Sequence, residues 1–232
     1  MLNNNTKVKC GLCIHQQQCF FNSLNDTEHD IIDKNKTEVF YKAGETIYKQ
    51  GTSSNYLVFL LSGMVKVMIE GDHDKNLVLR LGKPFQILDF PAIFDDNMLY
   101  RSCVTVVDSR ACLIDIDVFK SILLSNKKYV PLLFSHLNKT QNIYSKRLIN
   151  LIYKNMEARI ADALLYLVNE VYYSRVFTLT ISRKDLAELA GMSRESTSRI
   201  LRQFKEQDLL RIRGKEIEIL NKKGLEYLSA VG

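Results

Sequence analysis

The stretch ISRKDLAELAGMSRESTSRILRQFKEQ, residues 181–207, decides the fold of the second half of the chain. Ser182 can cap a first helix, with Asp185 three residues later as its capping-box partner. Gly191 can end this helix in the left-handed conformation that glycine adopts most easily, and Ser193 can cap a second helix. Two short helices joined by a tight glycine turn form a helix-turn-helix, whose second helix enters the major groove of DNA.

The second helix carries the residues that we predict to contact DNA. Spacings of three and four place them on one side of the helix, away from an apolar face formed by Ile200, Leu201 and Phe204. Arginine binds guanine through two hydrogen bonds, glutamate accepts one from cytosine, and serine bonds to bases or phosphate. Phosphate would repel a glutamate here, which favours base reading over a merely solvated surface. The predicted contacts are Ser193, Arg194, Glu195, Ser198 and Arg199.

The charge of the chain is unevenly distributed. The formal net charge is +6, and 46% of the 232 residues are hydrophobic, which is enough for a proper core. Residues 1–134 contain 15 basic and 15 acidic residues, so residues 135–232 supply the whole excess. A neutral first part and a basic second part are typical of a sensor joined to a nucleic-acid binder.

Neither a membrane protein nor an enzyme is favoured by the sequence. No run of 18 apolar residues exists, and the polar N-terminus has no apolar signal region. The four histidines are scattered, and neither a His-x-x-x-His motif nor a phosphate-binding loop occurs. We therefore expect a cytoplasmic protein that makes no membrane contact and has no catalytic residues.

Three of the five cysteines lie close together near the N-terminus. Cys10, Cys13 and Cys19, called the cysteine triplet below, have the spacing C-x2-C-x5-C. Thiolates are soft ligands that select zinc or iron–sulfur clusters. A fourth ligand is still needed, and Cys103 and Cys112 are the candidates, with His15 less favoured. Redox-active thiols that bind no metal, and inert thiols, remain the alternatives.

The middle of the chain changes from strands to a long helix. Residues 38–116 contain short β-rich runs separated by glycines, which indicates an antiparallel sandwich or roll. From about residue 125 to residue 155, apolar positions recur at alternating intervals of four and three, which indicates a coiled-coil dimer. The alternative is a helix that packs on the core of its own domain. The predicted dimer interface comprises Phe134, Leu137, Gln141, Tyr144, Leu148 and Leu151.

The run Ser193–Leu201 resembles the recognition helix of the CRP/FNR family of bacterial transcription regulators, and AGETI at 43–47 and LSGMVKV at 61–67 resemble its β-roll. The resemblance implies an α+β fold with an N-terminal antiparallel β-roll of the cyclic-nucleotide-binding-like type, a long dimerisation helix and a C-terminal winged helix-turn-helix. The implied organisation is a cysteine-rich segment 1–24, a β-roll sensor domain 25–124, a dimerisation helix 125–155 and a DNA-binding domain 156–232.

The resemblance also implies the partners. Family members are homodimers that bind palindromic double-stranded DNA, and RNA polymerase is the expected further partner. Arg194, Glu195 and Arg199 match base-reading residues of the cAMP-responsive branch, whereas Glu195, Ser198 and Arg199 match those of the FNR branch. The recognition helix alone therefore does not choose between the two half-sites.

The cysteine pattern resembles that of the FNR branch, which holds a [4Fe-4S] cluster on an N-terminal triplet and one distant cysteine. By position, Cys10, Cys13 and Cys19 match the triplet and Cys112 matches the distant ligand. This resemblance implies a redox sensor of oxygen or nitric oxide. The alternatives are a regulator with a structural zinc on these cysteines, or one that responds to haem or a small effector in the β-roll.

Cyclic AMP is not the expected effector. Arg101-Ser102 matches the pair that binds the cyclic phosphate in nucleotide-binding members of the family. The stretch 84–90 lacks the glycine and glutamate that those members use for the ribose. Without that glutamate, the ribose hydroxyl would lose its acceptor, which costs about 1–3 kcal/mol for a buried donor.

Overall fold

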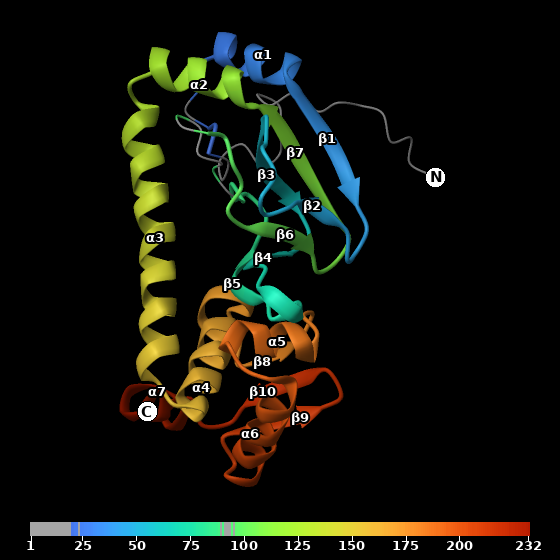
Figure 1. Cartoon of the computed structure of the whole chain (residues 1–232), viewed down its shortest axis with the longest axis vertical. Helices are drawn as coiled ribbons and strands as arrows, with labels where there is room; N and C mark the ends of the chain where they lie inside the picture. The colour runs from blue at the N-terminus through green and yellow to red at the C-terminus, as the bar shows by residue number, and fades with distance from the viewer. Residues whose placement is uncertain (1–19, 23, 89, 91–93, 95) are drawn as a thin grey trace. The chain divides into compact units, whose positions relative to one another are not determined.

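The computed structural model describes residues 20–22, 24–88, 90, 94 and 96–232 (Figure 1). The cysteine triplet therefore lies outside the described residues. The described chain forms two compact units. The first contains the residues up to Val67 together with Gly82–Leu137, and the second contains Met68–Leu81 together with Asn138–Gly232.

The strands of the first half form two antiparallel sheets, as the glycine-punctuated pattern predicts. One sheet has the order β1-β7-β3, and the other has the order β2-β6-β4-β5. The predicted β-roll is confirmed. The strands are β1 (Lys36–Tyr41), β2 (Thr46–Tyr48), β3 (Tyr56–Ser62), β4 (Val65–Ile69), β5 (Leu77–Gly82), β6 (Ser102–Thr105) and β7 (Ser109–Asp115), with a short 3-10 helix, η3 (Asp72–Asp74), between β4 and β5.

The sheet β1-β7-β3 has a separate apolar cluster on each face, because side chains alternate along a strand. The inner cluster, between the sheets, contains Val58 and Leu60 of β3 together with Cys103. The outer cluster contains Phe59 of β3, Cys112 of β7 and residues of the helices that cover this face. Cys112 lies directly opposite Phe59 in the register of the two strands.

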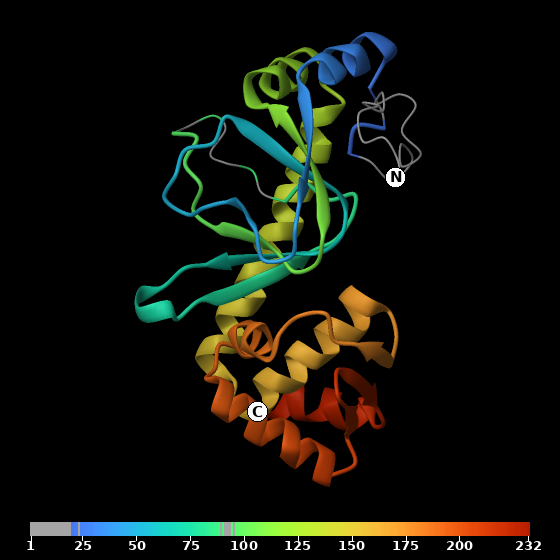
Figure 2. The same cartoon turned by 90° about the vertical axis from the view of Figure 1, so that its right-hand side faces the viewer.

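Three helices belong wholly or partly to the first unit. They are α1 (Asp26–Lys34), α2 (Ile116–Ser125) and α3 (Tyr129–Tyr153). Figures 1 and 2 both show α1 and α2 side by side at one end of the roll. Asn25 caps α1 through a capping box with Glu28. Pro131 lies in the first turn of α3, where a missing N–H costs nothing.

The long helix α3 has two apolar faces. Tyr129 and Leu133 on one face are buried in their own chain. The predicted dimer positions divide between the two faces, because a heptad pattern does not reveal which side meets the same chain. Phe134, Gln141 and Leu148 are exposed, whereas Leu137, Tyr144 and Leu151 are half-buried.

The second unit contains the predicted winged helix-turn-helix. Its three strands form an antiparallel sheet of order β8-β10-β9. Among the described residues, no helix combines the length and apolar character needed to cross a membrane. The elements are α4 (Met156–Tyr166), a π-helical turn η4 (Leu167–Tyr172), β8 (Val176–Thr178), α5 (Arg183–Ala190), α6 (Arg194–Glu206), β9 (Leu210–Arg213), β10 (Glu216–Ile219) and α7 (Lys222–Val231).

Candidate nucleic-acid interface

Local hydrogen bonds set the two ends of α5 as its sequence predicts. The hydroxyl oxygen of Ser182 accepts from the backbone N–H of Asp185 at 3.0 Å, and Asp185 Oδ2 accepts from the backbone N–H of Ser182 at 2.9 Å. Gly191 follows the helix with φ of 62°, in the left-handed region. The capping box and the glycine turn are both confirmed.

Two arginines hold this turn from behind. Arg159 of α4 donates from Nη1 to the carbonyl oxygen of Gly191 at 3.1 Å. Arg147 of α3 donates from Nη1 to the carbonyl oxygen of Leu189 at 2.5 Å. Burial lowers the pKa of Arg147 from its usual value. These bonds satisfy carbonyl groups at the end of α5, which have no partner within the helix, and so they fix where α6 starts.

The recognition helix α6 has one buried and one exposed face. Thr197, Ile200, Leu201 and Phe204 are buried. Ser193 caps the helix by accepting from the backbone N–H of Ser196 at 3.1 Å. Ser198 donates its hydroxyl proton to the carbonyl oxygen of Arg194 at 2.9 Å, which leaves its oxygen able to accept. All five predicted contacts, Ser193, Arg194, Glu195, Ser198 and Arg199, are exposed.

The exposed face extends one turn further than predicted, to Arg202. This exposed arginine follows Glu195 by seven residues, which is two helical turns. The spacing alone could have identified it, although nothing in it distinguishes a DNA contact from a solvated charge. The face thus presents Arg194, Arg199 and Arg202 around a single acidic residue, Glu195.

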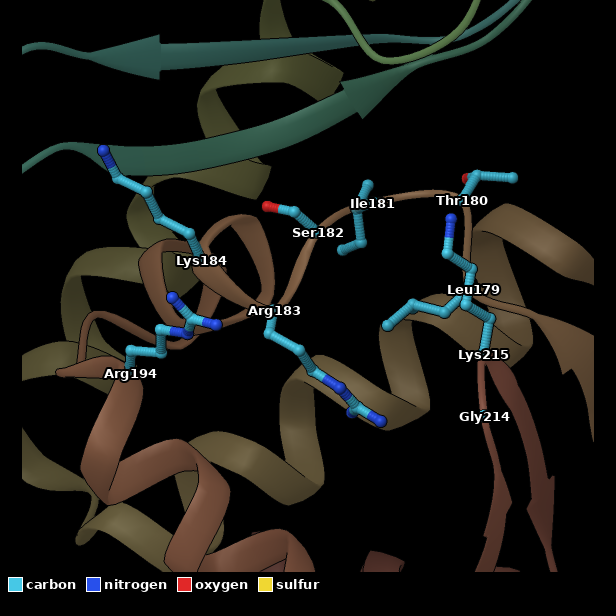
Figure 3. Close-up of a pocket in the computed structure, with 9 residues that line it drawn as sticks. All are labelled: Leu179, Thr180, Ile181, Ser182, Arg183, Lys184, Arg194, Gly214 and Lys215. Carbon is cyan, nitrogen blue, oxygen red and sulfur yellow. The ribbon is translucent and has the colours of Figure 1, made fainter.

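A basic pocket of about 380 Å³ lies beside the start of α6 (Figure 3). Three separate segments line it: residues 179–184, Arg194, and the turn Gly214-Lys215 of the β9–β10 hairpin. Its cationic side chains are Arg183, Lys184, Arg194 and Lys215. An anion the size of a phosphate group suits such a site, because arginine and lysine are the usual protein partners of phosphate.

Arg183 of this pocket has a buried nitrogen that could donate to an anion. Its Nη1 is buried and has no hydrogen-bond partner in the part of the chain that the structure describes. Burial lowers the pKa of Arg183 from its usual value. A buried donor without an acceptor is costly, and a phosphate oxygen in the pocket would supply one. The sequence does not single out Arg183, because the pocket forms only when segments distant in the sequence meet.

The predicted wing is the hairpin of β9 and β10. Glu216 pairs with Arg213, so the turn contains only Gly214 and Lys215. Gly214 has φ of 61°. Arg211 forms an ion pair with Glu218 across the hairpin at 2.7 Å. Of the three wing cations, Arg213 and Lys215 are therefore better placed than Arg211 to neutralise phosphate.

The two cysteines of the β-roll lie on opposite faces of the sheet β1-β7-β3. Cys103 is 0% exposed in the inner cluster, and Cys112 is 6% exposed in the outer one. Within the described part of the chain, neither cysteine is joined in a disulfide. The described residues contain no cluster of three or more metal-ligating side chains, and Cys10, Cys13 and Cys19 are not among them.

The second unit thus offers two kinds of contact to one ligand. The exposed face of α6 has the donors and acceptors that distinguish base edges, and the basic pocket and wing have the charge that binds phosphate. Double-stranded DNA presents both base edges and phosphate groups. Sequence comparison agrees, because residues 158–228 match the Crp-like helix-turn-helix domain and residues 38–126 match the cyclic nucleotide-binding domain.

Known proteins resemble the chain along most of its length. It is 23% identical over 198 residues to the CRP-like cAMP-activated global transcriptional regulator of Mycobacterium tuberculosis H37Rv, covering 84% of this chain and 88% of that one. It is 22% identical over 183 residues to the cAMP-activated global transcriptional regulator CRP of Salmonella typhimurium, covering 77% and 87%.

Solved structures show the same fold. FixK2 from Bradyrhizobium japonicum matches with a TM-score of 0.76 at 19% identity, covering 85% of this chain and 98% of that one. A putative regulator of the Crp/Fnr family from Eubacterium rectale matches with a TM-score of 0.75 at 20% identity, covering 91% and 97%. The chain belongs to the CRP/FNR family of DNA-binding transcription regulators.

Proposed function

We propose that this regulator is a homodimer whose binding to palindromic DNA depends on a [4Fe-4S] cluster, and that it senses oxygen or nitric oxide. The cluster ligands would be Cys10, Cys13, Cys19 and Cys112. RNA polymerase is the partner through which it would control transcription. When bound, the cluster would supply the reactivity toward the gas, and the chain would supply the response.

The position of Cys112 is the observation that supports this proposal. Cys112 lies opposite Phe59 on the neighbouring strand, and the ring centroids of Phe59 and Phe21 are 6.1 Å apart. Phe21 follows Cys19 by two residues. The Cys112 thiol is thus in the same apolar cluster as the residues that continue from the triplet.

Cys103 is a poorer fourth ligand. Its cluster contains Val58 and Leu60, which point to the opposite face of β3 from Phe59. Phe21 lies on the other face of the sheet β1-β7-β3. A cluster that joined Cys103 to the triplet would therefore have to reach from one face of this sheet to the other. The apolar surroundings of Cys112 also suit an iron–sulfur cluster, because burial and limited access to water tune the reduction potential of such a cluster.

Two features of the β-roll disfavour cyclic AMP as the effector. The hydroxyl of Ser102, which matches a phosphate-binding position, is fully buried and accepts from the backbone N–H of Gln50 at 2.8 Å. In the stretch that lacks the ribose-binding pair, Ile87 and Leu88 are buried in the core. We expect cyclic AMP to leave the DNA affinity unchanged.

The test is metal analysis of the full chain purified without oxygen. We expect about four iron and four acid-labile sulfide per chain and a broad optical absorption that air removes. Cys112→Ser should abolish iron binding, and Cys103→Ser is the matched control that should retain it. Operator affinity of the wild type should fall when air destroys the cluster.

Other outcomes would overturn the proposal in identifiable ways. Zinc in place of iron would indicate a structural site on the cysteines, and a sharp Soret band would indicate haem. Iron-free protein that still bound its operator would exclude cluster control. Retention of the cluster in Cys112→Ser but not in Cys103→Ser would show that the fourth ligand is wrongly chosen.

A further inference from the structure

The two residues directly after Cys19 pack against α2, and the first of them also packs against the start of α3. The ring centroid of Phe20 lies 5.7 Å from that of Tyr129, the first residue of α3, and 6.3 Å from that of Phe119 in α2. Phe21 is 2% exposed and meets Phe119 edge-on at 6.1 Å. We call Phe20, Phe21, Phe119 and Tyr129 the aromatic anchor.

Hydrogen bonds link α1 to the junction of α2 and α3 and to Phe21. Asn126, between α2 and α3, donates from Nδ2 to both carboxylate oxygens of Glu28, at 3.0 and 3.1 Å. Its Oδ1 accepts from the backbone N–H of Lys128 at 3.1 Å. His29 is buried and its Nε2 donates to the carbonyl oxygen of Phe21 at 3.0 Å. The segment that leaves the cysteine triplet is therefore bonded to the residues that begin α3.

The first turns of α3 connect the aromatic anchor to the proposed dimer face. Tyr129 and Leu133 are buried in the cluster that contains Phe21. Val130 and Phe134 are the next residues along the helix and are exposed. Successive residues of a helix are 100° apart around its axis, and the helix moves as a rigid body. A shift of Tyr129 must therefore also move Val130 and Phe134.

Phe20 is the residue best placed to report on the triplet. It is bonded directly to Cys19, it is only partly buried, and its ring contacts α3 itself. Phe21 is more deeply buried and contacts β3 and α2. A change at Cys19 therefore reaches α3 first through Phe20, whereas Phe21 anchors the segment to the sheet.

We propose that Phe20 and the Asn126–Glu28 contact transmit the state of the cysteine triplet to α3 and so set the strength of dimerisation. Phe20 is thus a positioning residue. This inference depends on the proposed function, because it requires that the triplet binds a metal. Metal bound by Cys19 would hold Phe20 against Tyr129, and loss of the metal would let Phe20 and the first turns of α3 shift.

The experiment compares the full chain with three variants. Phe20→Leu keeps an apolar side chain but loses the ring contact with Tyr129. Asn126→Ser keeps an acceptor for Lys128 but loses the donors to Glu28. Phe40→Leu is the control, because Phe40 is 55% exposed on β1 and lies outside the cluster. Iron and sulfide content, and dimer dissociation constants by sedimentation, are measured before and after exposure to air.

The expected result concerns the ratio of dimer dissociation constants, air-exposed to iron-loaded. Phe20→Leu should bind iron as the wild type does and reduce this ratio by roughly three- to tenfold, the factor that one aromatic pair contributes to an equilibrium. Asn126→Ser should reduce it in the same direction, and Phe40→Leu should leave it unchanged. Hydrogen exchange in residues 129–137 should differ between the two states in the wild type but not in Phe20→Leu.

The possible failures are distinguishable. Wild-type chain without iron would overturn both the proposed function and the anchor. Iron-loaded Phe20→Leu and Asn126→Ser with the wild-type ratio would overturn the anchor alone. If Phe20→Leu bound no iron, the ratio for Asn126→Ser would decide, because Asn126 is far from the triplet in the sequence and supplies no ligand.

Discussion

Two arginines of the helix-turn-helix are expected to bind DNA in different ways. Arg183 lies in the basic pocket, and its buried Nη1 has no hydrogen-bond partner among the described residues, which suits a backbone phosphate. Arg183→Ala should weaken binding to the operator and to unrelated DNA by the same factor. It should also reduce the slope of log affinity against log salt by about one, because one fewer counterion is released.

Arg199 is expected to read a base instead. Arg199→Lys keeps the positive charge but loses the two-pronged hydrogen bond to guanine, so operator binding should lose about 1–3 kcal/mol while unrelated DNA is bound as before. Fluorescence anisotropy with both DNAs over a salt series measures the two effects. Arg175→Ala, an exposed residue outside the pocket, is the control. The opposite pattern for the two arginines would reverse their assigned roles.

The exposure of a side chain could be predicted from the sequence where it depends on local spacing alone. The exposure of Arg194, Glu195 and Arg199 follows from helical spacing within one short segment. The basic pocket around Arg183 was not predicted, because it needs residues that are distant in the sequence. The pairing of Arg211 with Glu218 was also missed, because it depends on the register of the β9–β10 hairpin.

Two glycines in turns should respond differently to the same substitution. Gly191 and Gly214 both have positive φ, 62° and 61°. A Cβ on Gly214 would meet nothing within 4 Å, whereas one on Gly191 would collide with Leu151 of α3. Gly214→Ala should therefore cost about 1–2 kcal/mol of unfolding free energy for the left-handed backbone alone. Gly191→Ala should cost about 1 kcal/mol more, the low end for overpacking, because the Leu151 side chain can rotate.

Urea unfolding, followed by circular dichroism, measures the difference between these two variants. Gly191→Ala should also weaken operator binding, because Arg159 holds the Gly191 carbonyl group and the turn sets the start of α6. Gly214→Ala should affect the wing alone. Equal losses of stability in the two variants would show that Leu151 does not constrain the turn.

Helix ends were predictable where a cap is coded by nearby residues, and less so elsewhere. The caps Ser182 and Ser193 and the end at Gly191 follow from interactions within four residues. The change from α4 to the π-helical turn at Leu167 was not predicted, because the apolar pattern continues through Val168 and Val171. The predicted dimer positions combined residues of both faces of α3 for a different reason. A stripe of apolar residues does not indicate whether its own chain or a second subunit covers it.

At the scale of the molecule, the alternation of side chains across one sheet separates the candidate metal ligands. The sequence left the fourth ligand open between Cys103 and Cys112, since both lie in strands. Only the pairing of β7 with β3 shows that Cys112 shares a face with Phe59. The charge asymmetry, in contrast, was visible at once, because the basic residues that bind DNA need no tertiary contact to be counted.

Dimerisation through α3 leads to the last prediction. Leu148 is 60% exposed on the outward face, and in a dimer this face would be covered by its copy. In Leu148→Glu, each subunit would have to bury a carboxylate without a partner, which costs about 3 kcal/mol or more and raises the dimer dissociation constant at least roughly a hundredfold. Sedimentation should show monomers at concentrations where the wild type is dimeric.

The control for this variant is Lys146→Glu, which makes a larger change of charge at an exposed position of α3. Lys146 precedes Leu148 by two residues and so points about 200° away from it around the helix. Lys146→Glu should remain dimeric. Leu148→Glu should keep the thermal stability of the individual chain and its affinity for a single half-site. It should lose tight binding to the palindrome, because paired half-sites need two linked recognition helices. A dimeric Leu148→Glu would mean that a different face of α3 joins the subunits.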